Sequence, residues 1–323
     1  MTERSEEKDR GVLAVVVPCY NEEAVLDITT RRLEAVIGRL VESGELSADS
    51  YILYVNDGSS DTTWQLIERY YNEGRRVGGV NLAANAGQQN ALLAGMTVAK
   101  ADADMIVTID ADLQDSPEAI PEMVKHYNDG CDIVYGVRNN RDSDSWFKRT
   151  TAQTFYRLMR RLGVKDVDNR PNFRLMSRRA VEQLLRYRER NLFLPGMVPL
   201  IGYKTANVYY ARDKRAAGES KYSTAKLVNI AVDAITSFSS KPVRMVLMLG
   251  VIFLIITLLI LIYVIVSIVR GLTVPGWSSL MLSIWFCSGC ILTALGIVGE
   301  YIGKIYIEVK DRPRYNIDTV IKP

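Results

Sequence analysis

The sequence predicts an α/β protein with a mostly parallel sheet, followed by an amphipathic helix and two membrane-spanning helices. Three observations lead to this fold class. In the first half of the chain, short β-branched and apolar runs alternate with stretches of helical periodicity. A polar cluster follows three of those apolar runs, where each strand should end. After residue 240, two uncharged apolar runs are each long enough to cross a bilayer.

The strands and helices of the first half follow from local patterns. The expected strands cover residues 12–18, 51–55, 77–82, 105–109 and 132–136. The expected helices cover residues 22–42, 87–99 and 117–128, with a further helix capped by Asp61. Ligands of such sheets bind beyond the carboxyl ends of the strands. We therefore expect PCYNE, NDGSSD and DADLQD, which follow three strands, to meet at one edge.

The sequence MIVTIDADLQ, at residues 105–114, is the most informative segment. An apolar strand leads directly into Asp110, Asp112 and Gln114. Alternate residues of an extended chain share a face, so these three side chains should point the same way. Two carboxylates and an amide oxygen suit Mg²⁺ or Mn²⁺ bound together with a diphosphate. A single motif this short is more often an acidic turn, so the interpretation depends on the rest of the chain.

Composition argues against several classes of function. The 40 Lys and Arg residues nearly balance 37 Asp and Glu, which argues against a general nucleic-acid binder. A single histidine, His126, nearly excludes histidine triads and histidine-rich metal sites. The four cysteines show no pairing pattern, which fits a reducing compartment; Cys287 and Cys290 lie in an apolar run and suggest packing. The charged N-terminus is not followed by an apolar segment, so we expect no signal peptide.

The last third of the chain predicts membrane attachment. Residues 226–242 have the spacing of an amphipathic helix on a membrane surface. Residues 245–269 and 277–299 are uncharged and of spanning length. The connector between them carries only Arg270, whereas basic residues flank the pair on the other side, at Lys241, Arg244, Lys304, Lys310, Arg312 and Arg314. Positive charge marks the cytoplasmic side of a membrane.

From these patterns we expect a protein of the cell (inner) membrane whose chain has four parts. They are a cytoplasmic α/β domain (1–225), a juxtamembrane helix (226–242), two transmembrane helices (243–303) and a cytoplasmic tail (304–323). Small residues along the second span, such as Gly289 and Gly296, permit close helix packing, so the sequence is compatible with a homo-oligomer.

An ordered set of motifs spans essentially the whole chain. The set comprises PCYNE (18–22), VNDGSSD (55–61), ANAGQQNALLAGM (84–96), DADLQDSPEAIPEM (110–123), YGVR (135–138), FRLMSRRAV (173–181) and RAAGESKY (215–222). It resembles the polyprenyl-phosphate glycosyltransferases of the GT-A type, family 2, which include dolichyl-phosphate mannosyltransferases and bactoprenol glucosyltransferases. Each block alone is weakly specific, but their order is not. The two C-terminal spans match the bacterial bactoprenol branch best.

The resemblance implies a GT-A fold, a nucleotide-sugar donor, Mg²⁺ or Mn²⁺, and a polyprenyl phosphate acceptor in the membrane. The residues implied at the nucleotide are Pro18, Tyr20 and Glu22, with Asp57 accepting a hydrogen bond from the base. Those implied at the diphosphate are Asp110, the metal ligands Asp112 and Gln114, and the phosphate-binding Arg138, Arg215 and Lys221. For Arg215 and Lys221 the simpler alternative is attraction to anionic lipid.

Two positions depart from the family pattern. Asn56 stands where relatives commonly have Asp. Asn172 precedes FRLM where relatives usually carry an Asp that is often regarded as catalytic. An amide accepts no proton, so a general base at position 172 is in doubt, whether the change is natural or inactivating. On our interpretation a side chain here orients a sugar hydroxyl or a basic group such as Arg174.

The expected acceptor makes a general base unnecessary. The second pKa of a phosphate monoester is about 6, so the dianion is already a nucleophile at neutral pH. We expect in-line attack with inversion. The candidates for holding the acceptor phosphate are Lys148, Arg149, Arg170 and Arg174. UDP-glucose is the first choice of donor, followed by UDP-N-acetylglucosamine or UDP-galactose, and then GDP-mannose.

Three other functions compete with this one. Asn172 alone favours a catalytically disabled membrane scaffold, and the intact DADLQ and RAAGESK oppose it. A processive polysaccharide synthase is disfavoured because the chain contains no QxxRW block and too few spans for a channel. A transporter built on the two spans is disfavoured because they lack the charged residues expected in mid-membrane.

Overall fold

The computed structural model describes residues 10–138, 172–189, 194–210 and 276–323, with isolated positions between 246 and 270. The chain divides into two units. The first comprises Met1–Tyr156, Asp166–Tyr222 and Arg312–Pro323, and the second Arg157–Lys165 and Ser223–Asp311. The first unit contains the sheet and the second contains the long helix α10 (Trp277–Val309).

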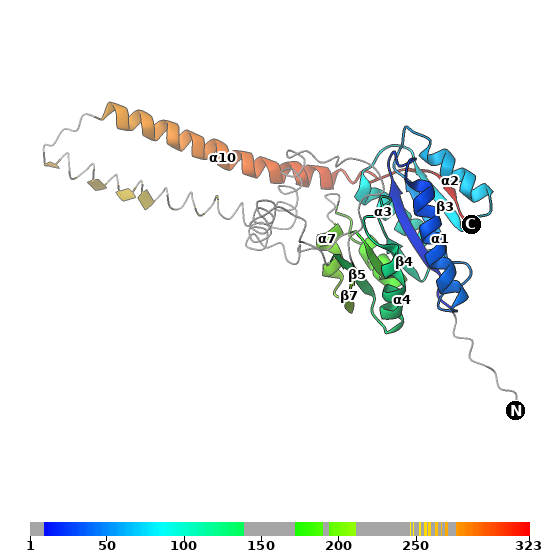
Figure 1. Cartoon of the computed structure of the whole chain (residues 1–323). Helices are drawn as coiled ribbons and strands as arrows, with labels where there is room; N and C mark the ends of the chain where they lie inside the picture. The colour runs from blue at the N-terminus through cyan, green and yellow to red at the C-terminus, as the bar shows by residue number, and fades with distance from the viewer. Residues whose placement is uncertain are drawn as a thin grey trace. The chain divides into compact units, whose positions relative to one another are not determined.

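An eight-stranded mixed sheet forms the first unit, in the order β7-β5-β6-β4-β1-β2-β3-β8 (Figure 1). Its strands are β1 (Leu13–Cys19), β2 (Tyr51–Asn56), β3 (Val77–Leu82), β4 (Met105–Thr108), β5 (Ile133–Arg138), β6 (Arg174–Ser177), β7 (Thr205–Tyr210) and β8 (Ile317–Ile321). Parallel pairs join β1 to β2 and β4, β2 to β3, and β5 to β7. β6 runs antiparallel between β4 and β5, and β8 runs antiparallel along β3. All five expected strands are confirmed, but β6 and β8 make the sheet mixed rather than mostly parallel.

Helices connect the strands of the sheet, and they include the four that the sequence predicts. They are α1 (Leu26–Glu42), α2 (Thr63–Asn72), α3 (Gln88–Ala99), η1 (Pro117–Ala119), α4 (Ile120–Asn128), α6 (Arg178–Leu185), α7 (Leu194–Met197) and η2 (Val198–Ile201). α2 begins two residues after Asp61, so the N-cap residue is Thr62 rather than the expected Asp61; the carboxylate of Asp61 accepts the N–H of Thr63 at 3.0 Å. α3 lies close against β1 and β2, because a Cβ at Gly95 would come within 2.4 Å of Val16 and 2.8 Å of Val55.

The C-terminal residues belong to the sheet and are not a separate tail. β8 pairs along β3, Lys322 forms an ion pair with Asp102 at 2.6 Å, and the hydroxyls of Tyr315 and Thr97 are 2.9 Å apart. The expected boundary at residue 225 therefore leaves out a strand of the same sheet, because Ile317–Ile321 of the expected tail form β8. The residues of β8 are mostly exposed, which suits an edge strand, and its pairing covers the open edge of β3.

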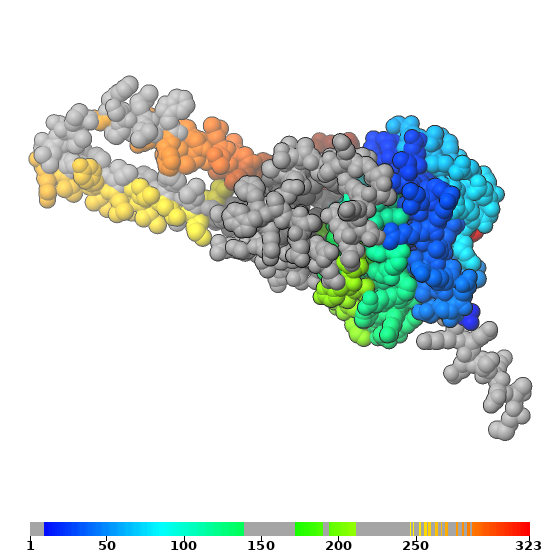
Figure 2. Space-filling model, viewed as in Figure 1, coloured from blue at the N-terminus to red at the C-terminus, as the bar shows by residue number. Residues whose placement is uncertain are grey.

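α10 exposes its apolar side chains along its length. Within it, Phe286–Val309 is long and apolar enough to cross a membrane, and none of it is buried. Leu292 and Leu295 are 69% and 66% exposed, and the atoms of α10 are orange in Figure 2. The helix continues ten residues beyond the expected end at Gly299. The isolated positions described between 248 and 269, such as Ile252 and Tyr263, are helical and exposed. The rest of the first predicted span, and the predicted helix at 226–242, lie outside the described residues.

Candidate functional site

The loops after β1, β2 and β4 meet at the carboxyl edge of the sheet, as the sequence predicts. The register aligns Cys19 of β1 with Asn56 of β2, so the loops that follow begin side by side. The N–H of Asn21 donates to Oγ of Ser59 at 3.0 Å, which joins the first loop to the second. The acidic loop after β4 is joined to α1 by the hydroxyl of Thr29, which donates to the carbonyl of Ala111 at 2.7 Å.

Three of the residues expected at the nucleotide lie in or beside the first loop. Pro18 is buried near the end of β1, whereas Tyr20 is 44% exposed at the edge of the sheet. Between Tyr20 and Glu22, Asn21 has a φ of 54°, a conformation uncommon for residues other than glycine. The N–H of Glu22 donates to Oγ1 of Thr63 at 3.0 Å, so this loop has a fixed shape.

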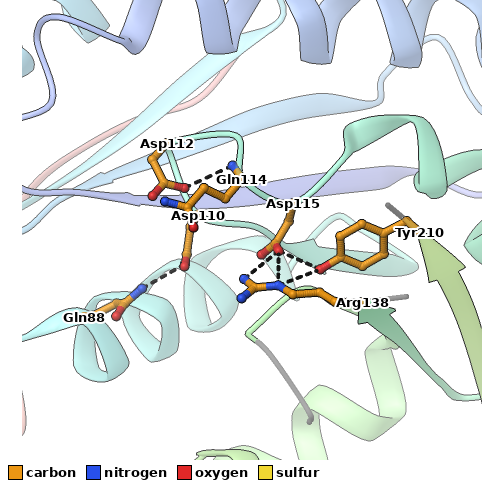
Figure 3. A network of polar contacts seen from close by, with 7 residues as sticks. All are labelled: Gln88, Asp110, Asp112, Gln114, Asp115, Arg138 and Tyr210. Atoms are coloured by element: carbon orange, nitrogen blue, oxygen red, sulfur yellow. Dashed lines mark hydrogen bonds and ion pairs between the residues drawn. The ribbon is translucent and has the colours of Figure 1, made fainter. Parts of the chain in front are cut away.

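The acidic loop is a turn, which corrects the expectation of an extended strand. β4 ends at Thr108, and Leu113 has a φ of 50° although it is buried. Such a conformation is unfavourable for leucine and is typically retained where a functional geometry requires it. Within the turn, the backbone N–H of Gln114 donates to Oδ1 of Asp112 at 3.2 Å (Figure 3).

Asp110 lies in a field of negative charge. Nε2 of Gln88, at the start of α3, donates to its Oδ1 at 2.8 Å. Burial, and then the charges of Asp115 and Asp112, raise the pKa of Asp110 to about 7. No group of three His, Cys, Asp or Glu residues in the described ranges is arranged to hold a metal. Two crowded carboxylates with the amide of Gln114 nevertheless fit a hard divalent cation, because the cation relieves their repulsion.

Asp115 is a buried charge that the sequence analysis did not single out. It is 1% exposed, and its Oδ1 accepts hydrogen bonds from Arg138 at 2.7 Å and from the hydroxyl of Tyr210 at 2.6 Å (Figure 3). Arg138, expected beside phosphate groups, therefore already has a protein partner. The charge of Asp115 and hydrogen bonding to it raise the pKa of Arg138, although burial opposes this. The acidic DADLQD motif contained the signal for Asp115; Tyr210 had none.

The side chain of Asp57 binds the backbone of the loop that precedes α3. Its carboxylate accepts the N–H groups of Ala86 at 2.7 Å and of Gly87 at 3.0 Å. Burial raises the pKa of Asp57, and these two hydrogen bonds oppose the rise. Gly58 adopts a φ of 66°, and a Cβ there would lie 2.6 Å from the nitrogen of Asn85. Asp57 thus shapes this side of the site; its hydrogen bond to a base stays a prediction.

The structure gives a physical reason for the unusual Asn56. Its Nδ2 donates to Oδ1 of Asn81 at 2.7 Å, and Asn81 in turn donates to Asp318 of β8 at 3.3 Å. The Oδ1 of Asn56 accepts the N–H of Ser59 at 3.2 Å. A carboxylate at position 56 has no N–H to give Asn81, so the amide suits this chain of hydrogen bonds.

Asn172 contacts the basic side chain proposed for it. Oδ1 of Asn172 lies 3.3 Å from Nη2 of Arg174, which is 2% exposed on β6. The hydroxyl of Thr108 donates to the carbonyl of Asn172, which ties this position to the end of β4. The other basic candidates, Lys148, Arg149, Arg170, Arg215 and Lys221, lie outside the described residues.

The chain is similar to known proteins over most of its length. The family model of glycosyl transferase family 2 matches residues 14–185, just over half of the chain. The chain is 47% identical over 311 residues to "Uncharacterized glycosyltransferase YkoT" of Bacillus subtilis, covering 96% of this chain and 92% of that protein. It is 38% identical over 310 residues to the "SfII prophage-derived bactoprenol glucosyl transferase" of Shigella flexneri, covering 94% and 97%. The solved mannosyl-3-phosphoglycerate synthase of Rubrobacter xylanophilus has 16% identity and a TM-score of 0.47, covering 73% of this chain and 74% of that one.

Proposed function

The chain belongs to glycosyl transferase family 2 and is a glycosyltransferase, and we propose that it transfers a hexose from a nucleotide-sugar donor to polyprenyl phosphate. UDP-glucose is the donor we favour, ahead of UDP-N-acetylglucosamine, UDP-galactose and GDP-mannose. The observation that supports a phosphate-bearing donor best is the acidic loop, where Asp110, Asp112 and Gln114 come together. A relative named for bactoprenol glucosyl transfer supports the lipid acceptor.

In this proposal the acidic loop holds the donor diphosphate through a divalent cation. Asp112 and Gln114 are the proposed ligands, with Asp110 beside them. The cation, when bound, neutralises charge on the departing diphosphate. Pro18, Tyr20 and Glu22 line the nucleotide from the first loop. The carboxylate of Asp57 holds the loop before α3 on another side of the site, because it accepts two backbone N–H groups of that loop.

The proposed chemistry needs no general base. The acceptor phosphate is largely a dianion at neutral pH and attacks the anomeric carbon in line. The bond between that carbon and the diphosphate oxygen breaks, and the configuration inverts. The protein contributes by positioning the reactants and neutralising their charge. Asn172 contributes through Arg174, whose guanidinium contacts its side-chain oxygen at 3.3 Å.

We propose two membrane crossings, with the sheet in the cytoplasm. β7 and β8 are strands of one sheet, so the chain segments before and after the apolar region lie on the same side of the membrane. A chain that crosses at α10 must therefore cross once more between β7 and α10. Residues 245–269 are the uncharged run of spanning length in that interval. Basic residues flanking the two runs favour the cytoplasmic side.

The length of α10 supports the same arrangement. Its 33 residues extend for about 50 Å, whereas the hydrocarbon core of a bilayer is about 30 Å thick. The uncharged residues 277–299 match that thickness. The charges Glu300, Lys304 and Glu308 occupy the last third of the helix and would lie at or beyond the membrane surface on the side of the sheet.

The deciding experiment is a turnover assay of the full chain in detergent. Undecaprenyl phosphate, Mn²⁺ or Mg²⁺ and a panel of radiolabelled nucleotide sugars are incubated with the wild type and with Asn172→Asp. We expect sugar-lipid from both proteins, with one donor preferred. Product from the Asp variant alone would mean that the wild type is a disabled form. Absence of product from both, with every donor, would favour the scaffold function that Asn172 suggests.

A further inference from the structure

One buried oxygen atom receives three hydrogen bonds from two side chains. Oδ1 of Asp115 accepts from Nε of Arg138 at 3.0 Å, from Nη2 of Arg138 at 2.7 Å and from the hydroxyl of Tyr210 at 2.6 Å. Burying a carboxylate is unfavourable unless it is paired and hydrogen-bonded. The three contacts meet that requirement, so Asp115, Arg138 and Tyr210 form one fixed cluster.

The cluster joins three segments that are distant in sequence. Arg138 and Tyr210 are the last residues of β5 and β7, and they face each other in the parallel register. Asp115 closes the acidic loop after β4, and β6 lies between β4 and β5 in the sheet. The carboxylate of Asp115 therefore contacts residues at the ends of β5 and β7, Arg138 and Tyr210 (Figure 3).

We propose that Asp115 and Tyr210 are positioning residues, which hold the guanidinium of Arg138 so that its Nη1 edge receives a phosphate group of a substrate. This inference rests on the proposed function and deepens it. A guanidinium has five N–H donors. The Nε and Nη2 edge faces Asp115, and no hydrogen bond within the described part of the chain uses Nη1. The Arg138 side chain is 30% exposed, so the pair with Asp115 does not bury it completely.

A fixed guanidinium binds phosphate better than a free one. A free arginine side chain loses rotamer entropy when a ligand immobilises it, and here the protein has already imposed that loss. The planar fork also presents its N–H groups at defined angles, which suits the oxygens of a phosphate. Burial, and then the charge of Asp115, raise the pKa of Tyr210, so its hydroxyl stays a donor at neutral pH.

The ring of Tyr210 is held independently of its hydroxyl. Phe173 packs edge-on against it, with ring centroids 5.3 Å apart and an interplanar angle of 81°. Gly136 leaves room for both rings, because a Cβ there would lie 2.5 Å from Phe173 and 3.0 Å from Tyr210. Tyr210→Phe therefore removes the hydrogen bond while the ring remains packed. The variant isolates positioning from folding.

The phosphate has two possible sources, the donor diphosphate and the acceptor monoester, and two measurements separate them. Isothermal titration calorimetry of the full chain with inorganic pyrophosphate and Mn²⁺ reports the diphosphate site without turnover. Steady-state transfer reports the KM for polyprenyl phosphate. Tyr209→Phe is the matched control, because Tyr209 is the preceding residue of β7 and is 59% exposed. Unchanged thermal melting of both variants verifies their folding.

We expect Tyr210→Phe to weaken one of the two phosphate interactions about fivefold to tenfold, which is the usual scale for the loss of one hydrogen bond. A loss of pyrophosphate affinity assigns Arg138 to the donor; a raised KM for the lipid with unchanged pyrophosphate affinity assigns it to the acceptor. Either supports the inference, provided that Tyr209→Phe behaves as the wild type. Arg138→Lys, which has no planar fork, should lose at least as much.

The inference and the proposed function fail in different ways. Transfer by the wild type with unchanged pyrophosphate affinity and unchanged KM in Tyr210→Phe would overturn the inference alone. An equal loss in Tyr209→Phe would also overturn it. If the wild type transfers no sugar, the proposed function fails, and the pyrophosphate titration then decides the inference by itself: weaker binding by Tyr210→Phe supports it and equal binding overturns it.

Discussion

The sheet and helix α10 are both rich in Val, Ile and Leu, but their apolar side chains have opposite surroundings. Every residue of β1 and β2 is buried, whereas Leu292 and Leu295 of α10 are more than half exposed. Each Å² of apolar surface removed from water contributes about 25 cal/mol. Side chains of the sheet gain this from one another, and those of α10 need a second apolar medium. The same residue types thus form a protein core in the sheet and, in the proposed arrangement, a lipid-facing surface on α10.

A charge introduced into each region should separate them most strongly. Leu53→Asp places an unpaired carboxylate in β2 at a site that is 0% exposed, at a cost of several kcal/mol. Since domains are stable by only about 5–15 kcal/mol, we expect no folded protein. Leu292→Asp should leave the sheet folded and weaken membrane insertion by about 3 kcal/mol. Circular dichroism and the fraction retained in alkali-washed membranes measure the two effects. An unfolded Leu292→Asp would contradict the comparison.

Glycine substitutions give the next largest difference. Gly95→Ala puts a Cβ within 2.4 Å of Val16, so α3 must shift from β1; overpacking of this kind costs about 1–3 kcal/mol. A Cβ at Gly296 of α10 meets nothing within 4 Å, so Gly296→Ala should leave stability unchanged. Thermal melting of the detergent-solubilised chain compares them. A drop for Gly296→Ala in the membrane would instead reveal a helix partner, such as a second copy.

β8 returns the chain from α10 to the sheet. A double-mutant cycle can test the hydrogen bonds that link Asp318 of β8, through Asn81, to Asn56. Asn56→Asp removes the donor to Asn81 and should cost at least about 1 kcal/mol. If Asn81 turns its amide toward the new carboxylate, it presents an oxygen to Asp318. Asp318→Asn then supplies the missing donor, so the double variant should recover part of the loss. Urea denaturation measures the cycle, and strictly additive effects would refute the coupling.

Removal of an ion pair at the surface should change stability least, in the sheet unit and in α10 alike. Arg32 pairs with Glu118 of the sheet unit at 2.6 Å, whereas Lys304 and Glu300 of α10 are 3.9 Å apart. Hydrogen bonding from Arg32 lowers the pKa of Glu118 to about 2, so the stabilisation is complete above the unfolded pKa of about 4.5. It is lost as the pH falls toward 2. Both partners are partly exposed, so Arg32→Ala should cost at most about 1 kcal/mol.

A pH series of urea titrations tests this pair. The difference in unfolding free energy between the wild type and Arg32→Ala should be constant above pH 5 and shrink on acidification, as Glu118 becomes protonated in both proteins. Lys304→Ala is the control and should show no such trend at any pH in this range. A difference that grows in acid would mean that another group controls the stability of this edge.

Local patterns predicted the strands that are continuous apolar runs and the helices with clear periodicity. The strand expected at residues 51–55 is β2 (Tyr51–Asn56), and the strand at 77–82 is β3. β6, β7 and β8 were missed because polar residues interrupt their short apolar runs, and each strand depends on partners far away in the chain. α10 was predicted too short, because three charges interrupt its apolar pattern without breaking the helix.

The sequence by itself determined the α/β class, the family and the chemistry available at the sheet edge, since motifs and hydrophobic periods are local properties. Only the tertiary structure decided that the acidic loop turns at Leu113, that Asn56 serves a hydrogen-bond chain reaching Asp318, and that Asp115 holds Arg138 with Tyr210. The physical reason is that a hydrogen bond or an ion pair depends on separation in space. The register of strands far apart in sequence sets that separation, and no local pattern records it.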